Sequence, residues 1–153
     1  MDDFETIRLQ IGRDPLPFEA VVARCSAGRP IVVRQPATTP AGAPFPTTFW
    51  LTCPGLVAAI GELESGGGVA DLAGRLAADA DLAVAFDEGR RRQLAIRPGL
   101  GDLGIGGTRS LRAVKCLHAH AAFAFGAGGY PVGDAIVAAA GGVPEPCCMG
   151  PAG

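Results

Sequence analysis

The chain has 153 residues, the usual size of one domain, with 48% hydrophobic residues and a formal net charge of −2. This composition excludes a chain that is disordered throughout. The 13 basic and 15 acidic residues nearly balance, so the protein has no general positive potential that would attract a polyanion, and no nucleic-acid partner is expected. No apolar run approaches the roughly 20 residues that span a bilayer, and the acidic start lacks the apolar core of a signal peptide. We therefore expect a cytoplasmic protein without membrane contacts, in which the five cysteines favour metal binding, redox work or burial over disulfides.

The first third of the chain predicts a small β-layer. Residues 1–19 contain no predicted element. The apolar runs Ala20–Arg24 and Ile31–Gln35 flank a Gly- and Pro-containing segment at 26–30, which favours a tight turn and therefore a β-hairpin. The aromatic and β-branched residues of Thr48–Thr52 favour a third strand.

Helical patterns follow in the remaining two thirds. The expected helices are Gly55–Leu63, Val69–Ala78, Ala80–Leu94, Leu111 to about Phe125, and Gly133–Ala140. Asp79 or Asp81 is expected to cap the third helix, and Ser110 the fourth. The expected fold is α+β: a β-hairpin or three-strand layer packed against about five helices, in a single domain of residues 1–153 with a flexible tail from about residue 141.

The segment KCLHAH at residues 115–120 contains the side chains best suited to metal binding or catalysis. Cys116 and His120 lie four residues apart in a predicted helix and therefore share one face, while His118 lies about 200° around the axis and is expected to point elsewhere. Thiolate and imidazole are ligands that zinc prefers, so the pair predicts a metal site. The same pair also suits nucleophilic catalysis, with Cys116 attacking and His120 acting as base.

Four further cysteines extend this hypothesis. Cys25 and Cys53 each follow a predicted strand, and Cys147 and Cys148 lie in a tail that could close over a site. No CxxC pair is present. Because free cysteines are often small buried hydrophobes, plain burial is the alternative.

A Gly-rich loop precedes the predicted Leu111 helix. Backbone N–H groups of Gly104, Gly106 and Gly107 at a helix N-terminus could hold a small anion, and Arg109 could add charge-assisted hydrogen bonds. The loop matches neither common nucleotide-binding pattern, so a flexible connection is the alternative.

Several short motifs then point to a family. They are Arg24-Cys25, Pro44-Phe45-Pro46-Thr47, Trp50-Leu51-Thr52-Cys53-Pro54, Gly104-Ile105-Gly106-Gly107, Lys115-Cys116-Leu117-His118-Ala119-His120 and Pro131-Val132-Gly133-Asp134. In this order they resemble a bacterial family catalogued as domain of unknown function 501. The resemblance runs from about Leu9 to the tail, and it implies a cytoplasmic domain without an established activity. Family members often carry a second cysteine two residues after the position of Cys25, where this chain has Ala27.

The leading hypothesis is a metal-binding domain, which the resemblance strengthens because cysteines recur in its motifs. Cys25, Cys53 and Cys116 are the expected ligands, completed by His120 or by Cys147 or Cys148. Such a set suits tetrahedral zinc, and an all-cysteine set suits an iron–sulfur cluster. One alternative is an enzyme that uses Cys116 with His118 or His120 on an anionic substrate at residues 104–110. The other is a metal-free interaction module.

Overall fold

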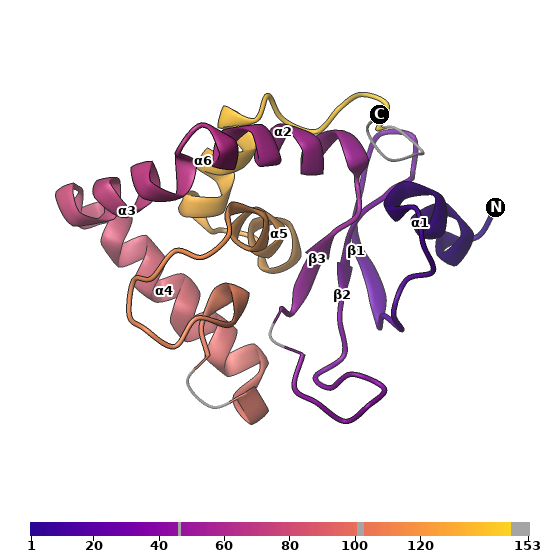
Figure 1. The fold of residues 1–153 in the computed structure, drawn as a ribbon, viewed down its shortest axis with the longest axis horizontal. Helices are drawn as coiled ribbons and strands as arrows, with labels where there is room; N and C mark the ends of the chain where they lie inside the picture. The colour runs from indigo at the N-terminus through magenta and orange to yellow at the C-terminus, as the bar shows by residue number, and fades with distance from the viewer. Residues whose placement is uncertain (46, 101–102, 148–153) are drawn as a thin grey trace.

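The computed structural model describes residues 1–45, 47–100 and 103–147, and the expected α+β class is confirmed (Figure 1). In these residues the elements are α1 (Asp3–Ile11), β1 (Ala20–Arg24), β2 (Pro30–Arg34), β3 (Phe49–Leu51), α2 (Pro54–Ser65), α3 (Gly68–Ala78), α4 (Ala80–Ile96), the 3-10 turns η1 (Pro98–Leu100) and η2 (Ile105–Gly107), α5 (Leu117–Ala127) and α6 (Pro131–Ala139). Within this described part of the chain, no helix has the length and apolar character needed to cross a membrane.

The sheet is antiparallel in the order β1-β2-β3. The predicted hairpin is confirmed: the N–H of Cys25 donates to the carbonyl of Arg29 at 2.9 Å, and Gly28 takes a φ of 77° that favours glycine. In the second pair Val32 lies opposite Leu51. The third strand was therefore also predicted correctly, and it forms one edge of the sheet.

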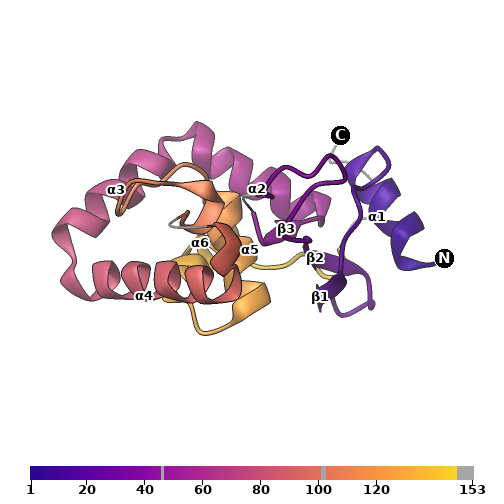
Figure 2. The ribbon, with the colours of Figure 1, turned by 90° about the horizontal axis from the view of Figure 1, so that it is seen from below.

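Helices cover both faces of this sheet. Figures 1 and 2 show α1 on one side of the strands and α5 on the other, with α2 and α6 beside α5 and the α3–α4 pair farthest from the sheet. The side chain of Asp79 accepts from the N–H groups of Asp81 and Leu82, which confirms the predicted cap of α4.

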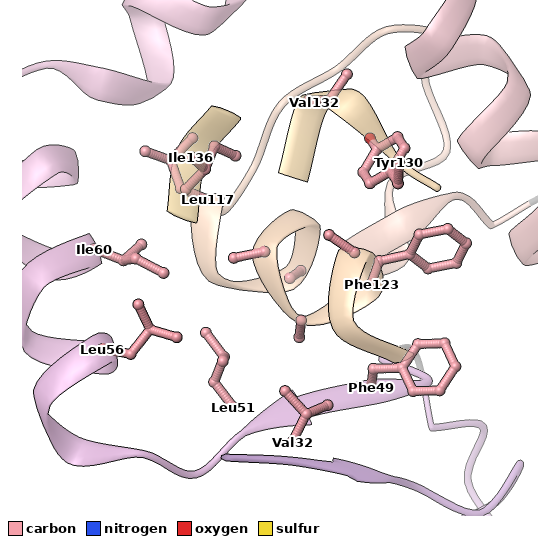
Figure 3. Close-up of a cluster of buried hydrophobic side chains, with 14 of the residues drawn as sticks. Val32, Phe49, Leu51, Leu56, Ile60, Leu117, Phe123, Tyr130, Val132 and Ile136 are labelled. Carbon is pink, nitrogen blue, oxygen red and sulfur yellow. The ribbon is translucent and has the colours of Figure 1, made fainter. Parts of the chain in front are cut away.

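The core is built around α5, which is apolar on almost every side. A surface helix shows one apolar stripe, whereas a helix that is apolar all round belongs in the interior. Figure 3 shows side chains of β2, β3, α2 and α6 converging on it, among them Val32, Leu51, Leu56 and Val132. Phe123 of α5 is itself 1% exposed. The position of α5 therefore determines how all layers meet.

Helix α1 is an element that the sequence analysis missed. The carboxylate of Asp2 accepts from the N–H of Glu5 at 2.8 Å, and Gly12 ends the helix with a φ of 74°. Both are ordinary helix-end signals. Ile7 and Gln10 are buried on the face that packs against β2.

The predicted start of the fourth helix was wrong. Ser110 does not cap a helix, because α5 begins only at Leu117. Arg112 has a φ of 57°, outside the right-handed helical region, and its guanidinium pairs with Asp87 at 3.0 Å. Cys116 is extended, with φ −153° and ψ 125°. The residues before Leu117 therefore reach α5 through a turn and an irregular segment that is neither helix nor strand.

Close contact between α5 and α6 depends on Gly133. A Cβ atom there would lie 2.3 Å from the backbone oxygen of His120 and 2.6 Å from the Cβ of Ala124. Because the first of these contacts is with backbone, a side chain at this position requires the two helices to separate.

We predict that Gly133→Ala lowers the free energy of unfolding by about 1–3 kcal/mol, the usual cost of overpacking. Gly74→Ala in the exposed part of α3 is the matched control, since no atom lies within 4 Å of its added Cβ. That control should stabilise the helix by up to about 1 kcal/mol. Urea unfolding of both variants checks the difference, and equal stability of the two would contradict the close contact.

Candidate metal centre and adjoining cavity

Three potential ligands meet where α2 ends and α5 begins. Cys116 Sγ lies 3.7 Å from His118 Nδ1, which lies 3.1 Å from the Oε1 atom of Glu64. All three ligand atoms lie within 4.8 Å of one another, and no other His, Cys, Asp or Glu trio in the described residues does so. The side chains are partly buried, with 25% of His118 and 27% of Glu64 exposed.

The orientation of the His118 ring is defined by its second nitrogen. Nε2 donates to the backbone carbonyl of Val57 in α2 at 2.9 Å. A neutral ring with its proton on Nε2 presents the Nδ1 lone pair to Cys116 and Glu64. Histidine ligands of metals commonly donate their other ring N–H to a carbonyl or carboxylate in this way.

The two carboxylate oxygens of Glu64 make different contacts. Oε2 accepts from the N–H of Leu117 at 2.8 Å, so Glu64 caps α5 from a different helix. A carboxylate at this position is also favoured by the partial positive charge of a helix N-terminus. The other oxygen faces His118. The same contact therefore fixes the start of α5 and one side of the ligand cluster.

The cluster favours positive charge. Hydrogen bonding to Cys116 raises the pKa of His118 to about 9, against the effect of burial. The hydrogen bond to the Val57 carbonyl and the electrostatic interactions with Cys116 and Glu64 also raise the pKa of His118. A proton or a metal ion at Nδ1 would meet the same attraction.

The expected pairing of Cys116 with His120 was wrong, and His118 takes its place. Because the helix begins at Leu117, Cys116 lies outside it and His118 is in its first turn. His120 is 1% exposed, and its Nδ1 lies 2.8 Å from the hydroxyl of Tyr130. Burial lowers its pKa to about 4, so it is neutral near pH 7.

The other cysteines that were expected to be metal ligands do not belong to this cluster. Cys147 donates to Cys25 with 3.0 Å between the sulfur atoms. Burial raises the pKa of the Cys147 thiol, and the contact with Cys25 and the fully buried Cys53 add to that rise. Within the described residues, Cys25, Cys53 and Cys116 do not form a group within 4.8 Å. Cys148 lies outside the described residues.

The Cys25–Cys147 pair holds residues 145–147 against the β1–β2 hairpin. Burial acts to raise the pKa of Cys25, but hydrogen bonds from Cys147 and from the backbone of Arg29 and Ala27 lower it to about 7. Arg29 also donates to the carbonyl of Cys147, and Ser26 bonds Glu145. The thiol pair is thus part of a packed and hydrogen-bonded contact between residues 145–147 and the hairpin.

The Gly-rich loop closes on itself. The N–H of Gly104 donates to Thr108 at 2.7 Å, and the N–H of Gly107 donates to Gly104 at 2.9 Å. Two of the amides expected to hold an anion are therefore bonded inside the loop, and the expected helix does not follow it. Arg109 is exposed, whereas Gly106 lines the cavity described next.

A cavity of about 780 Å³ adjoins the ligand cluster. Its wall comes from the end of α1, from β3, from the first half of α2 and from residues 106–119, and it includes Cys116 and His118. Cavities of roughly 300–1,000 Å³ are typical of small-molecule sites. The ligand cluster therefore has direct access to a volume that could hold a small organic molecule.

One comparison identifies relatives of the chain. The model of the family described as "Protein of unknown function (DUF501)" matches residues 21–102 and 97–138, which is most of the chain. The chain belongs to the DUF501 family. Comparisons with curated proteins and with solved structures give no match. The suspected resemblance is confirmed, and the match includes the α2 and α5 residues of the ligand cluster in this DUF501 domain.

Glu64 is the residue of this DUF501 site that the sequence analysis missed. It stands 53 residues before Leu117, whose N–H it accepts, and no motif connects the two positions. His118 was recognised but assigned to the opposite side of the helix. Both errors come from the helix start, which local sequence did not reveal.

We predict that His120 makes this DUF501 domain sensitive to acid. Between pH 6.5 and about 4 the unfolded chain binds a proton at His120 that the folded chain excludes. The free energy of unfolding should therefore fall with decreasing pH by up to about 1.4 kcal/mol per pH unit from this group. His120→Gln should lose that contribution. The control His118→Gln should keep it, because His118 has a raised pKa. Chemical unfolding at several pH values measures the slopes, and equal slopes for wild type and His120→Gln would contradict the assignment.

We also predict that a mild thiol oxidant such as diamide joins Cys25 to Cys147 before it modifies the other described cysteines. Their sulfur atoms are 3.0 Å apart and need to approach by only about 1 Å to reach disulfide length. Peptide mapping by mass spectrometry identifies the linked pair, and Cys25→Ser should abolish it. A first disulfide that contains Cys53 or Cys116 would be inconsistent with this packing.

Proposed function

We propose that this DUF501 domain binds a zinc ion through Glu64, Cys116 and His118. The observation that carries the proposal is the placement of one His118 nitrogen, Nδ1, against both the thiol and the carboxylate, while Nε2 is bonded to Val57. Ligands at tetrahedral angles around zinc lie about 3.3–3.6 Å apart, because Zn–N and Zn–O bonds are about 2.0 Å and Zn–S bonds about 2.3 Å long. The separations of 3.7 and 3.1 Å bracket that range.

The donor set favours zinc over an iron–sulfur cluster. Sulfur, nitrogen and oxygen donors together are common at zinc sites, whereas iron–sulfur clusters need several thiolates. Sites with three protein ligands leave a fourth position for water or substrate, as in catalytic rather than structural zinc sites. Here the adjoining cavity offers access to that position.

The same geometry argues against a metal-free catalytic triad. In a nucleophile–histidine–acid relay, one ring nitrogen faces the nucleophile and the other faces the acid. In this domain both Cys116 and Glu64 lie at Nδ1, and Nε2 is occupied by the Val57 carbonyl. A cation between the three groups satisfies their negative charge and lone pairs more directly than a proton relay does.

The proposal assigns the domain to a reducing compartment, the cytoplasm. Cys116 must remain a thiolate to bind zinc, and oxidation would remove it as a ligand. Cys25, Cys53 and Cys147 form no disulfide, which is compatible with such an environment.

We predict one equivalent of zinc per chain, with affinity lowered at least tenfold in Cys116→Ser, His118→Gln and Glu64→Gln. Each substitution removes a donor or its charge, and even changes outside the ligand shell typically cost 10- to 100-fold. Elemental analysis after dialysis gives the stoichiometry, and competition with a chromophoric chelator gives the affinity.

Cys25→Ser and His120→Gln are the matched controls, because they change the same residue types away from the cluster. Both should retain zinc. If Cys25→Ser loses the metal and Cys116→Ser keeps it, the proposed site is wrong. A brown protein with iron and sulfide would instead indicate a cluster held by the other cysteines.

A further inference from the structure

The accessible part of the cavity wall is mainly apolar. Trp50 and Val57 line the cavity and are 40% and 36% exposed, and the neighbouring Ala58 is exposed as well. Phe49 and Leu51 also line it, although they are only 4% and 6% exposed. An indole on a concave apolar surface is a common contact for hydrocarbon or aromatic groups. The wall therefore favours a ligand with an apolar body.

The candidate zinc ligands border the same cavity. Cys116 and His118 line it, and both side chains are partly exposed. Three protein ligands leave one position of a tetrahedral zinc ion for another donor. A molecule in the cavity can therefore reach the metal, provided that one end of it carries a zinc-binding group.

The charges around the metal favour an anionic group at that end. Zn²⁺ carries two positive charges, which the Cys116 thiolate and the Glu64 carboxylate cancel, so an anionic fourth ligand leaves one negative charge. Lys115 is exposed, lines the cavity and directly precedes Cys116 in the chain. Within the described residues it has no ion pair or hydrogen bond. Its ammonium group can therefore neutralise an anion that is bound to the metal.

No other charge on the wall opposes an anion. The guanidinium of Arg13 also lines the cavity and already donates to the carbonyl of Asp14 at 3.5 Å. No Asp or Glu of the described residues lines the cavity. Because like charges brought together are costly, the absence of a carboxylate from this part of the wall favours an anionic ligand over a cationic one.

We propose that the cavity binds a monocarboxylate with an apolar body, such as a medium-chain fatty acid. Its carboxylate takes the fourth position at zinc and pairs with Lys115, and its hydrocarbon chain packs on Trp50 and Val57. This inference rests on the proposed zinc site and names the ligand of that site. A carboxylate fits better than a neutral group, because oxygen is a common zinc donor and only an anion uses the charge of Lys115.

Cobalt in place of zinc separates the two proposals. A thiolate–cobalt charge-transfer band in the wild-type spectrum, abolished in Cys116→Ser, reports metal binding at the cluster, and the cobalt d–d bands report the fourth ligand. Octanoate should shift the d–d bands in a saturable way. Absence of the charge-transfer band would overturn the proposed zinc site and this inference with it. A charge-transfer band with d–d bands that octanoate leaves unchanged would overturn this inference alone.

The sole tryptophan of the chain, Trp50, reports on the hydrocarbon chain of the ligand. Titration of the zinc-loaded full chain with octanoate should change its fluorescence in a saturable way. Butyrate should bind at least about tenfold more weakly, because it lacks four CH₂ groups and each buried CH₂ contributes up to about fourfold in affinity. Octanol and octyltrimethylammonium, which lack the negative charge, should both bind more weakly than octanoate. Removal of zinc should weaken octanoate binding at least about tenfold, since an interaction no weaker than one charged hydrogen bond is lost.

Variants assign the contacts to their residues. Lys115→Met should weaken octanoate about two- to fivefold, as expected for one exposed ion pair, and leave octanol binding and zinc content unchanged. Arg109→Met, at an exposed basic residue that does not line the cavity, is its control. Ala58→Phe should block octanoate by filling the cavity while it keeps the charge-transfer band, which establishes that the cluster is folded. Val84→Phe, at an exposed site away from the cavity, should bind octanoate normally.

The inference is overturned if octanoate gives no saturable fluorescence change in the zinc-loaded wild type. It is equally overturned if the metal-free protein binds octanoate as tightly, or if octyltrimethylammonium binds as tightly as octanoate. Retention of both the charge-transfer band and octanoate binding in Ala58→Phe would place the ligand outside the cavity. Equal losses of affinity in Arg109→Met and Lys115→Met would indicate a general effect of surface charge and contradict the pairing with Lys115.

Discussion

The contact between Glu64 and the first turn of α5 is the constraint on which the rest of the structure depends. One carboxylate oxygen accepts from Leu117 and so sets where the helix begins. That start leaves Cys116 in extended backbone, brings His118 beside it and turns His120 inward to Tyr130. Had the helix begun six residues earlier, as its sequence allows, the cysteine would face a different histidine and the ligand cluster would not form.

Tight packing of the interior around α5 fixes the position of that helix. It is apolar nearly all round, and glycines at its contacts let neighbouring elements approach closely. Gly133 touches the backbone of His120, while Gly126 of α5 itself lies against the Phe49 ring of β3. The sheet, α6 and the buried imidazole are consequently packed as one unit. The first turn of α5, where the candidate ligands lie, is therefore supported by a packed interior rather than by loops alone.

Short sequence patterns predicted the parts of the fold that depend on interactions between residues close together in the chain. The hairpin followed from β-prone runs around Gly28, and the α4 cap followed from Asp79. The ligand cluster did not follow, because Glu64 and Leu117 are distant in sequence and residues 111–116 contain no helix breaker. The left-handed Arg112 is likewise stabilised by an ion pair to α4 that no spacing rule reveals. Sequence could therefore identify Cys116 and His118 as chemically interesting, but not which partners they have.

The docking of residues 145–147 on the β1–β2 hairpin also has a consequence for the order of events during synthesis. Cys147 is 122 residues later in the chain than Cys25, so at about 5–20 residues per second the ribosome needs roughly 6–24 s to supply it. During that interval the hairpin has no Cys147 above it, and Cys25 has neither the sulfur contact nor the tail that covers it. A nascent chain therefore passes through a period in which this thiol is open to premature reaction, and the completed contact ends that period.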